Sequence, residues 1–218
     1  MPSRNTVKHF DTDQMWHAYN RGANKCDIFL DEQDYKVFLS FLKFCLSEEE
    51  DKQLISEAMT AVDADRLRRL KLYKEVKLVS YCLMPNHYHL QLFQYSHDGI
   101  SKLMRSVMTG YVSYFNRRHD RQGHLFQGIY KASLINSDSY WLHISRYIHL
   151  NPIDLGVSYQ SYDYSSYKYY SGTVTAPRWL STDFVVGQFS SAQDYIDFCD
   201  DYTGYKSGLK DIKEHTAD

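Results

Sequence analysis

The chain has 218 residues, a formal net charge of −2 at pH 7, and 43% hydrophobic residues. This apolar fraction can form a packed core and excludes a wholly disordered chain. No apolar run approaches the roughly 18 residues that a membrane span needs, and the polar N-terminus does not resemble a signal peptide. The four cysteines lie far apart without a Cys-x-x-Cys pair, which argues against a disulfide framework or a cysteine zinc site. We therefore expect a soluble, cytoplasmic protein with one main domain.

The pattern of apolar residues predicts strands that alternate with helices. Alternating or β-branched runs indicate strands, and apolar residues at helical spacing indicate amphipathic helices. In chain order the predicted elements are a strand over 15–19 with a turn at 20–22, a helix over 34–46, a charged helical insertion over about 48–75, two strands over 76–84 and 87–94 that form a hairpin, a helix over 100–118, β structure over 123–135, and a helix from Ser137 or Asp138 to about Leu150. This order predicts an α+β sandwich of the ferredoxin or RRM type, with helices packed on a mostly antiparallel sheet.

Basic residues are concentrated in the middle of the chain, although the overall charge is close to neutral. Between residues 100 and 135, six basic residues stand against one acidic residue. The six are Lys102, Arg105, Arg117, Arg118, Arg121 and Lys131. Such a segment is compatible with a face that binds phosphate groups, and it is also compatible with a solvated helix face. Charge alone leaves both interpretations open.

The most informative short motif is a pair of histidines, His87 and His89, in a predicted strand. Alternate side chains of a strand share a face, so both imidazoles point one way while Tyr88 and Leu90 point the other way. Two imidazoles about 7 Å apart along a strand can converge on one ion, and with an oxygen ligand they suit a divalent cation such as Mn²⁺, Mg²⁺ or Zn²⁺. The motif alone also fits histidines of the surface or the core.

A second set of polar residues lies along the predicted helix that ends near Leu150. His143, Tyr147 and Asn151 are spaced four residues apart, so they lie on one stripe of the helix. Tyr147 would project a phenol from a rigid element, and Asn151 can offer its carbonyl oxygen to the same ion. The spacing alone favours a structural interpretation, with an interface tyrosine and an asparagine that ends the helix before Pro152.

Several segments in this order resemble the HUH endonucleases, and among them the single-tyrosine transposases of the insertion-sequence type. The likeness is strongest to the REP-associated tyrosine transposases. The segments are YNRG at 19–22, MPNHYHL at 84–90, YFNRR at 114–118, GHLFQGIYKA at 123–132 and RYIHLNP at 146–152. The charged insertion is longer than the family pattern, and Ile129 stands where the family more often has a basic residue.

The resemblance implies an enzyme that cleaves and rejoins single-stranded DNA. Tyr147 would be the nucleophile and would form a 5′-phosphotyrosine, while His87, His89 and Asn151 would hold a divalent metal ion, Mg²⁺ or Mn²⁺. A phenol with a pKa near 10 needs activation, for which His143 or a water molecule are candidates. The partner would be single-stranded or hairpin DNA, contacted by basic residues. The main candidates are Arg117, Arg118, Arg121 and Lys131. Lys102 and Arg105, on the predicted helix over 100–118, are further candidates.

The resemblance also implies a domain organisation and leaves the assembly open. Residues 1–155 would form the catalytic domain, and residues 156–218 a tyrosine-rich extension with a short helix near 192–202 that packs on it. The six tyrosines between 159 and 170 either pack over the fold or form a stacking platform for bases. The active site is either complete in one chain or shared in a homodimer in which the partner supplies the tyrosine helix.

Two other functions compete with this reading. The first is a non-catalytic relative that binds hairpin DNA through the same sheet and basic helix. The second is an RRM-like RNA binder, because the predicted sheet order is similar. The histidine-bearing face of the strand over 87–94 argues against the RNA binder, because RNA-binding sheets of this type carry aromatic residues there.

Overall fold

The computed structural model describes residues 11–48 and 72–201. The predicted helical insertion over about 48–75 lies largely outside these residues. Its described end is a 3-10 turn over Leu72–Lys74 that leads into a strand. None of the helices in the described part of the chain has the length and apolar character needed to cross a bilayer.

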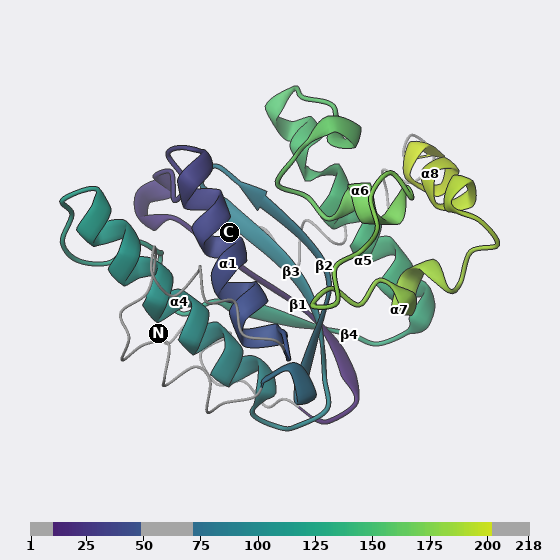
Figure 1. Ribbon diagram of the computed structural model, residues 1–218, viewed down its shortest axis with the longest axis horizontal. Coiled ribbons are helices and arrows are strands. Elements are labelled where there is room, and N and C mark those ends of the chain that lie inside the picture. The colour runs from purple at the N-terminus through teal and green to yellow at the C-terminus, as the bar shows by residue number, and fades with distance from the viewer. Residues whose placement is uncertain (1–10, 49–71, 202–218) are drawn as a thin grey trace.

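Four strands and two long helices form the first part of the fold, and a third long helix follows (Figure 1). The elements are β1 Gln14–Arg21, α1 Glu32–Leu46, β2 Val76–Met84, β3 His87–Gln94, α4 Gly99–Arg118, β4 Lys131–Ile135, α5 Asp138–Leu150, α6 Tyr167–Tyr170, α7 Asp183–Val186 and α8 Ala192–Asp200. The predicted strands of the hairpin match β2 and β3 at both ends, with a two-residue turn between them.

The strands form one sheet in the order β2-β3-β1-β4, and every pairing in it is antiparallel. The central pair brings together segments that are far apart in the sequence, with Tyr19 opposite His89 and Arg21 opposite His87. This order and direction confirm the predicted α+β sandwich of the ferredoxin type.

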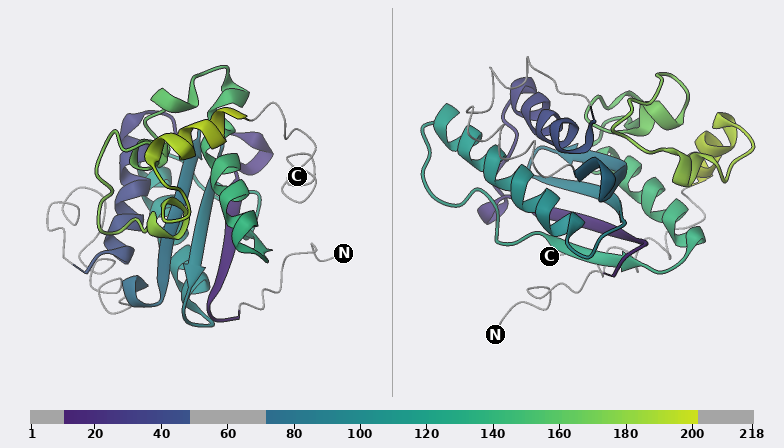
Figure 2. Two further views of the ribbon diagram at one scale, coloured as in Figure 1. Left: turned by 90° about the vertical axis from the view of Figure 1, so that its right-hand side faces the viewer. Right: turned by 60° about the horizontal axis from the view of Figure 1, so that its bottom comes forward.

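The two faces of the sheet are covered by different helices (Figures 1 and 2). Tyr88, Leu90 and Leu92 of β3 belong to the core cluster beneath α1 and α4. Phe93 of β3 belongs to a second cluster with Ile148 of α5 and with residues of the C-terminal segment. The strict alternation of the strand therefore assigns His87 and His89 to the face that α5 covers.

The helices begin where capping residues satisfy their first free N–H groups. The Asp31 carboxylate accepts from the backbone N–H groups of Gln33 and Asp34 and starts α1. The Ser137 hydroxyl accepts from the backbone N–H of Tyr140 and starts α5, as predicted. At its other end α5 passes directly into a 3-10 turn over Asn151–Leu155, which contains the predicted Pro152 stop.

The largest differences from the predicted boundaries are a turn and a strand. The predicted turn at 20–22 begins too early, because Asn20 and Arg21 continue β1 by pairing with β3. The predicted β structure over 123–135 is a strand only over Lys131–Ile135, and before it the chain touches the sheet through one bridge between Gly22 and Phe126. Gly123 adopts a φ of 87°, a left-handed value that interrupts an extended strand.

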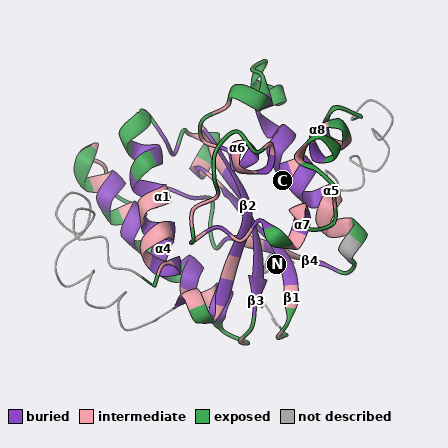
Figure 3. Ribbon diagram, turned by 45° about the vertical axis from the view of Figure 1, so that its right-hand side comes forward, coloured by how far each residue is buried: buried purple, intermediate pink, exposed green. Residues whose placement is uncertain are grey.

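The C-terminal segment packs over α5 and contributes to the core (Figure 3). Three of the tyrosines between 159 and 170 are buried, namely Tyr159, Tyr167 and Tyr170. Arg146 of α5 is buried as well, its guanidinium donates to the carbonyl oxygen of Phe198 in α8 at 3.0 Å, and it lies 4.2 Å from the Phe198 ring. This contact ties α8 to α5.

Candidate active site

The two histidines of β3 lie side by side on the face beneath α5. Their ring centroids are 5.1 Å apart and the rings are perpendicular. His87 is half-buried, and His89 is buried. The Nδ1 atom of His87 is 2.7 Å from the amide oxygen of Asn86. An amide oxygen only accepts, so Nδ1 of His87 carries the proton and its Nε2 keeps a lone pair.

Helix α5 places Tyr147 and Asn151 over these histidines. The Tyr147 ring stands edge-on to His89, with 5.5 Å between the centroids. Asn151, one turn later, donates to the backbone oxygen of Tyr147 at 2.8 Å and lines the same cavity as His87. The predicted metal ligands and the predicted nucleophile therefore meet in one place, all supplied by one chain.

A third histidine, which the sequence analysis missed, completes this cluster. His17 of β1 is fully buried, and its Nε2 atom is 2.8 Å from Nδ1 of His89. Its ring stacks on that of His89 at 5.0 Å and lies 5.9 Å from the ring of Tyr147. Alternation alone would have placed His17 on one face with Met15 and Tyr19, but only the pairing of β1 with β3 reveals which residues it meets.

The cluster holds its imidazoles in the neutral form. Burial lowers the pKa of His17 to about 3. Burial, helped by the charge of Arg21, lowers the pKa of His87 to about 4. Burial also lowers the pKa of His89 well below its ordinary value, and the two neighbouring imidazoles act in the same direction. Neutral imidazole is the form that binds a metal ion.

The donor set fits a weakly held divalent cation and differs from a structural zinc site. In the described ranges no three His, Cys, Asp or Glu residues are grouped to hold a metal. The ligands on offer are two imidazoles and the amide of Asn151, and such a set leaves coordination positions open for substrate oxygens. The Nε2 lone pair of His87 is consistent with this use.

These residues line a cavity of about 650 Å³. Its wall carries three basic side chains, Arg21, Lys25 and Lys131, against the single carboxylate of Asp154. A surplus of positive charge around a phenol and two imidazoles suits an anionic substrate such as a phosphodiester. Arg21 and Lys25 were not among the predicted DNA contacts. Strand pairing and the 3-10 turn after β1 bring them to the cavity, and neither feature can be read from the sequence pattern.

The six predicted DNA contacts lie in different environments. Lys131 lines the cavity of Tyr147. Arg118 forms ion pairs with Asp31 and Asp34, and Lys102 forms one with Glu75.

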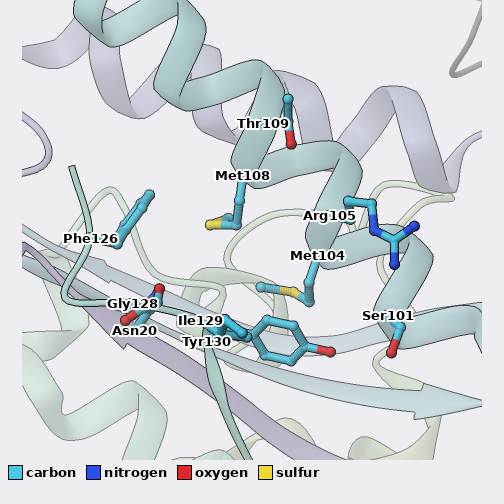
Figure 4. Close-up of a pocket in the computed structure, with 10 residues that line it drawn as sticks. All are labelled: Asn20, Ser101, Met104, Arg105, Met108, Thr109, Phe126, Gly128, Ile129 and Tyr130. Atoms are coloured by element: carbon cyan, nitrogen blue, oxygen red, sulfur yellow. The ribbon is translucent and has the colours of Figure 1, made fainter. Parts of the chain in front are cut away.

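The other three predicted contacts lie on or near α4. Arg117 is exposed, and the guanidinium of Arg121 lies 5.7 Å from the ring of Phe115. Arg105 lines a second cavity, of about 400 Å³, on the α4 side of the sheet, where Met104 and Met108 face the loop of Ile129 (Figure 4). Of the six predicted DNA contacts, Lys131 alone therefore lines the cavity that contains Tyr147.

His143, the candidate base, points toward the C-terminal segment. Its Nδ1 accepts from the guanidinium of Arg146 at 3.0 Å, since arginine only donates. Its ring lies 5.6 Å from that of Phe198. The ring contact adds to the packing of α8 on α5.

Comparisons with known proteins identify the family and the fold of the chain. The family model described as "Transposase IS200 like" matches residues 37–151, more than half of the chain, and the chain belongs to this family of DNA-processing transposases. This confirms the resemblance drawn from the sequence. A solved structure of a REP-associated tyrosine transposase bound to a REP hairpin covers 84% of this chain and 93% of its own, with a TM-score of 0.54 and 14% identity. At that identity it supports the fold. No curated protein matches the chain.

Proposed function

We propose that this protein cleaves and rejoins single-stranded DNA through a covalent 5′-phosphotyrosine at Tyr147. The observation that carries the proposal is that the Tyr147 ring stands 5.5 Å from the ring of His89 in a cavity lined by His87, Asn151 and basic side chains. A protein that only binds DNA has no need to bring a phenol, two neutral imidazoles and an amide together in a basic cavity.

The proposed reaction is a transesterification at phosphorus. The phenolic oxygen of Tyr147 attacks the scissile phosphate, the bond from phosphorus to the 3′-oxygen breaks, and the 3′-oxygen leaves as a hydroxyl. The phenolic proton passes to a base or a water molecule as the new bond forms, and the leaving 3′-oxygen takes up a proton from the same source. One phosphate ester replaces another, so a 3′-hydroxyl can later attack the phosphotyrosine and reseal a strand without a nucleotide cofactor.

His87, His89 and Asn151 are the residues that would hold a divalent cation, Mg²⁺ or Mn²⁺. A bound cation supplies charge neutralisation at a non-bridging phosphate oxygen. The chain itself keeps both imidazoles neutral, orients His87 through Asn86, and fixes the position of Asn151 on the backbone of α5. Arg21, Lys25 and Lys131 would guide the sugar-phosphate backbone into the cavity.

Hairpin DNA, or single-stranded DNA next to a hairpin, is the partner that we propose. The related fold of the REP-associated transposase was solved with a REP hairpin, and single-stranded DNA offers the flexible phosphate that an open basic cavity can admit. Tyr147, His87 and Asn151 of one chain line the same cavity, which favours a nucleophile that attacks a phosphate held at the same chain's cation site. The homodimer with an exchanged tyrosine helix stays an alternative prediction.

The test uses an oligonucleotide that carries a hairpin, labelled separately at each end. With Mn²⁺ or Mg²⁺ the wild type should transfer the 3′ label to a protein band on a denaturing gel, and the 5′-labelled product should have an extendable 3′-hydroxyl. Tyr147→Phe should abolish the covalent band and retain hairpin binding. Tyr140→Phe, on the same helix, is the matched control and should leave the band intact.

Two outcomes would overturn the proposal. A covalent band that persists in Tyr147→Phe would assign the nucleophile to another residue. Hairpin binding by the wild type without any covalent band would favour the non-catalytic DNA-binding relative.

A further inference from the structure

His17 and His89 form a buried pair in which one proton joins two ring nitrogens. The Nε2 atom of His17 is 2.8 Å from Nδ1 of His89, and the two rings stack at 20°. One imidazole must therefore donate and the other must accept.

The direction of this hydrogen bond decides whether His89 can bind a cation. If His17 donates, the proton of His89 sits on Nε2, and no lone pair of that ring is left for a metal ion. If His89 donates through Nδ1, its Nε2 keeps a lone pair. His89 lines the cavity that contains Tyr147, whereas its Nδ1 is engaged by His17.

We propose that His17 is a positioning residue that accepts the Nδ1 proton of His89 and so presents the Nε2 lone pair of His89 to the cation. The inference rests on the proposed function, since it concerns the same cation site. Asn86 performs the matching task for the other ligand, by accepting from Nδ1 of His87 at 2.7 Å. Both imidazoles are then held in the same tautomer by an acceptor behind them, an arrangement that metal-binding histidines commonly share.

The environment of His17 makes this arrangement sensitive to the cation. Its Nδ1 is buried and has no hydrogen-bond partner among the described residues. In the metal-binding tautomer that nitrogen carries a proton, and a buried donor without an acceptor is unfavourable. A cation bound at Nε2 of His89 would favour this tautomer and so would offset the cost.

The test measures Mn²⁺ affinity of the DNA-free protein by calorimetry. His17→Phe keeps the ring volume and removes the acceptor, and it should weaken Mn²⁺ binding by roughly 10- to 100-fold, as loss of a partner behind a metal ligand does. His17→Gln retains an acceptor oxygen and should restore affinity to within about threefold of wild type. Thermal unfolding of both variants verifies that they fold.

Each outcome has one meaning. Equal Mn²⁺ affinity in His17→Phe and wild type would overturn the inference while leaving the proposed function intact, and so would a His17→Gln variant as weak as His17→Phe. A wild type that binds no Mn²⁺ would instead refute the cation site of the proposed function, and the inference with it.

A direct observation covers the case in which the variants do not fold. Nitrogen-15 spectra of the wild-type imidazoles with saturating Mg²⁺ should show His89 protonated on Nδ1. Protonation on Nε2 under these conditions would overturn the inference without any substitution.

Discussion

Arg118 illustrates how an apparent DNA contact can have a structural role, and Arg118→Ala tests it. One guanidinium nitrogen is 2.6 Å from the carboxylate of Asp34, and another is 2.7 Å from that of Asp31. The Asp34 side chain is 0% exposed and that of Arg118 only 27%. These pairs join the start of α1 to the end of α4.

The expected loss in free energy of unfolding depends on the hydrogen bonds that Asp34 keeps after the substitution. Breaking a fully buried ion pair costs about 3–5 kcal/mol. Asp34 would keep its hydrogen bonds with the backbone N–H of Leu30, the Tyr114 hydroxyl and His119, and Arg118 is partly solvated. We therefore expect the free energy of unfolding to fall by about 2 kcal/mol, with Tm lower by about 4–8 °C.

The assay is urea unfolding at neutral pH, with hairpin affinity measured in parallel. Arg117→Ala, at the exposed neighbouring position, is the control and should change stability by less than about 0.5 kcal/mol. The reasoning would be refuted if Arg118→Ala were as stable as wild type, or if it lost hairpin affinity more than tenfold at unchanged stability.

The effect of Arg118→Ala should also depend on pH. A hydrogen bond from Arg118 lowers the pKa of Asp31 to about 2, from 3.8. A carboxylate whose pKa is lower in the folded protein adds stability above its unfolded pKa, and this stability disappears as the pH falls through the folded value. The contribution of Asp31 to the difference between wild type and variant should therefore shrink between pH 4 and pH 2. A difference that grew over this range would contradict the assignment.

Two further substitutions test the packing on each face of the sheet. Gly110→Ala should lower the free energy of unfolding by about 1 kcal/mol, because the added methyl group overlaps the ring of Phe41 and this cost exceeds the gain in helix propensity. Urea unfolding measures the change. Increased stability would show that the α1–α4 contact can relax. His149→Leu should lower the free energy of unfolding by about 2 kcal/mol in the same assay, because the buried imidazole bridges the hydroxyls of Tyr195 and Ser166 at 2.6 and 2.7 Å. An unchanged Tm would show that other partners satisfy those hydroxyls.

The sequence predicted the elements whose signals are local. Strand β3 could be placed at both ends, because its alternation has a fixed period and a two-residue turn precedes it. The same alternation put His87 and His89 on one face, and helical spacing put Tyr147 and Asn151 on one stripe. Their predicted roles in binding metal and attacking DNA remain proposals.

The sequence could not predict features that depend on distant pairings. His17 acquires its position next to His89 from the register between β1 and β3, which are separated by some 70 residues of chain. Charge counting also treated Arg118 and Lys131 alike, although one is paired with carboxylates and the other lines the cavity. Composition reports the sign of a side chain, whereas its partner is set by the tertiary fold.

The attachment of α8 to α5 has a consequence for stoichiometry. The contact between Arg146 and Phe198 holds α8 against the outer side of α5, the helix that carries Tyr147. Exchange of α5 with a neighbouring molecule would therefore expose a buried guanidinium. Under the proposed function, a Tyr147 that stays with its own molecule would hold one broken DNA end at a time. The release of a DNA segment between two cuts would then require either two molecules acting together or two successive reactions of one molecule.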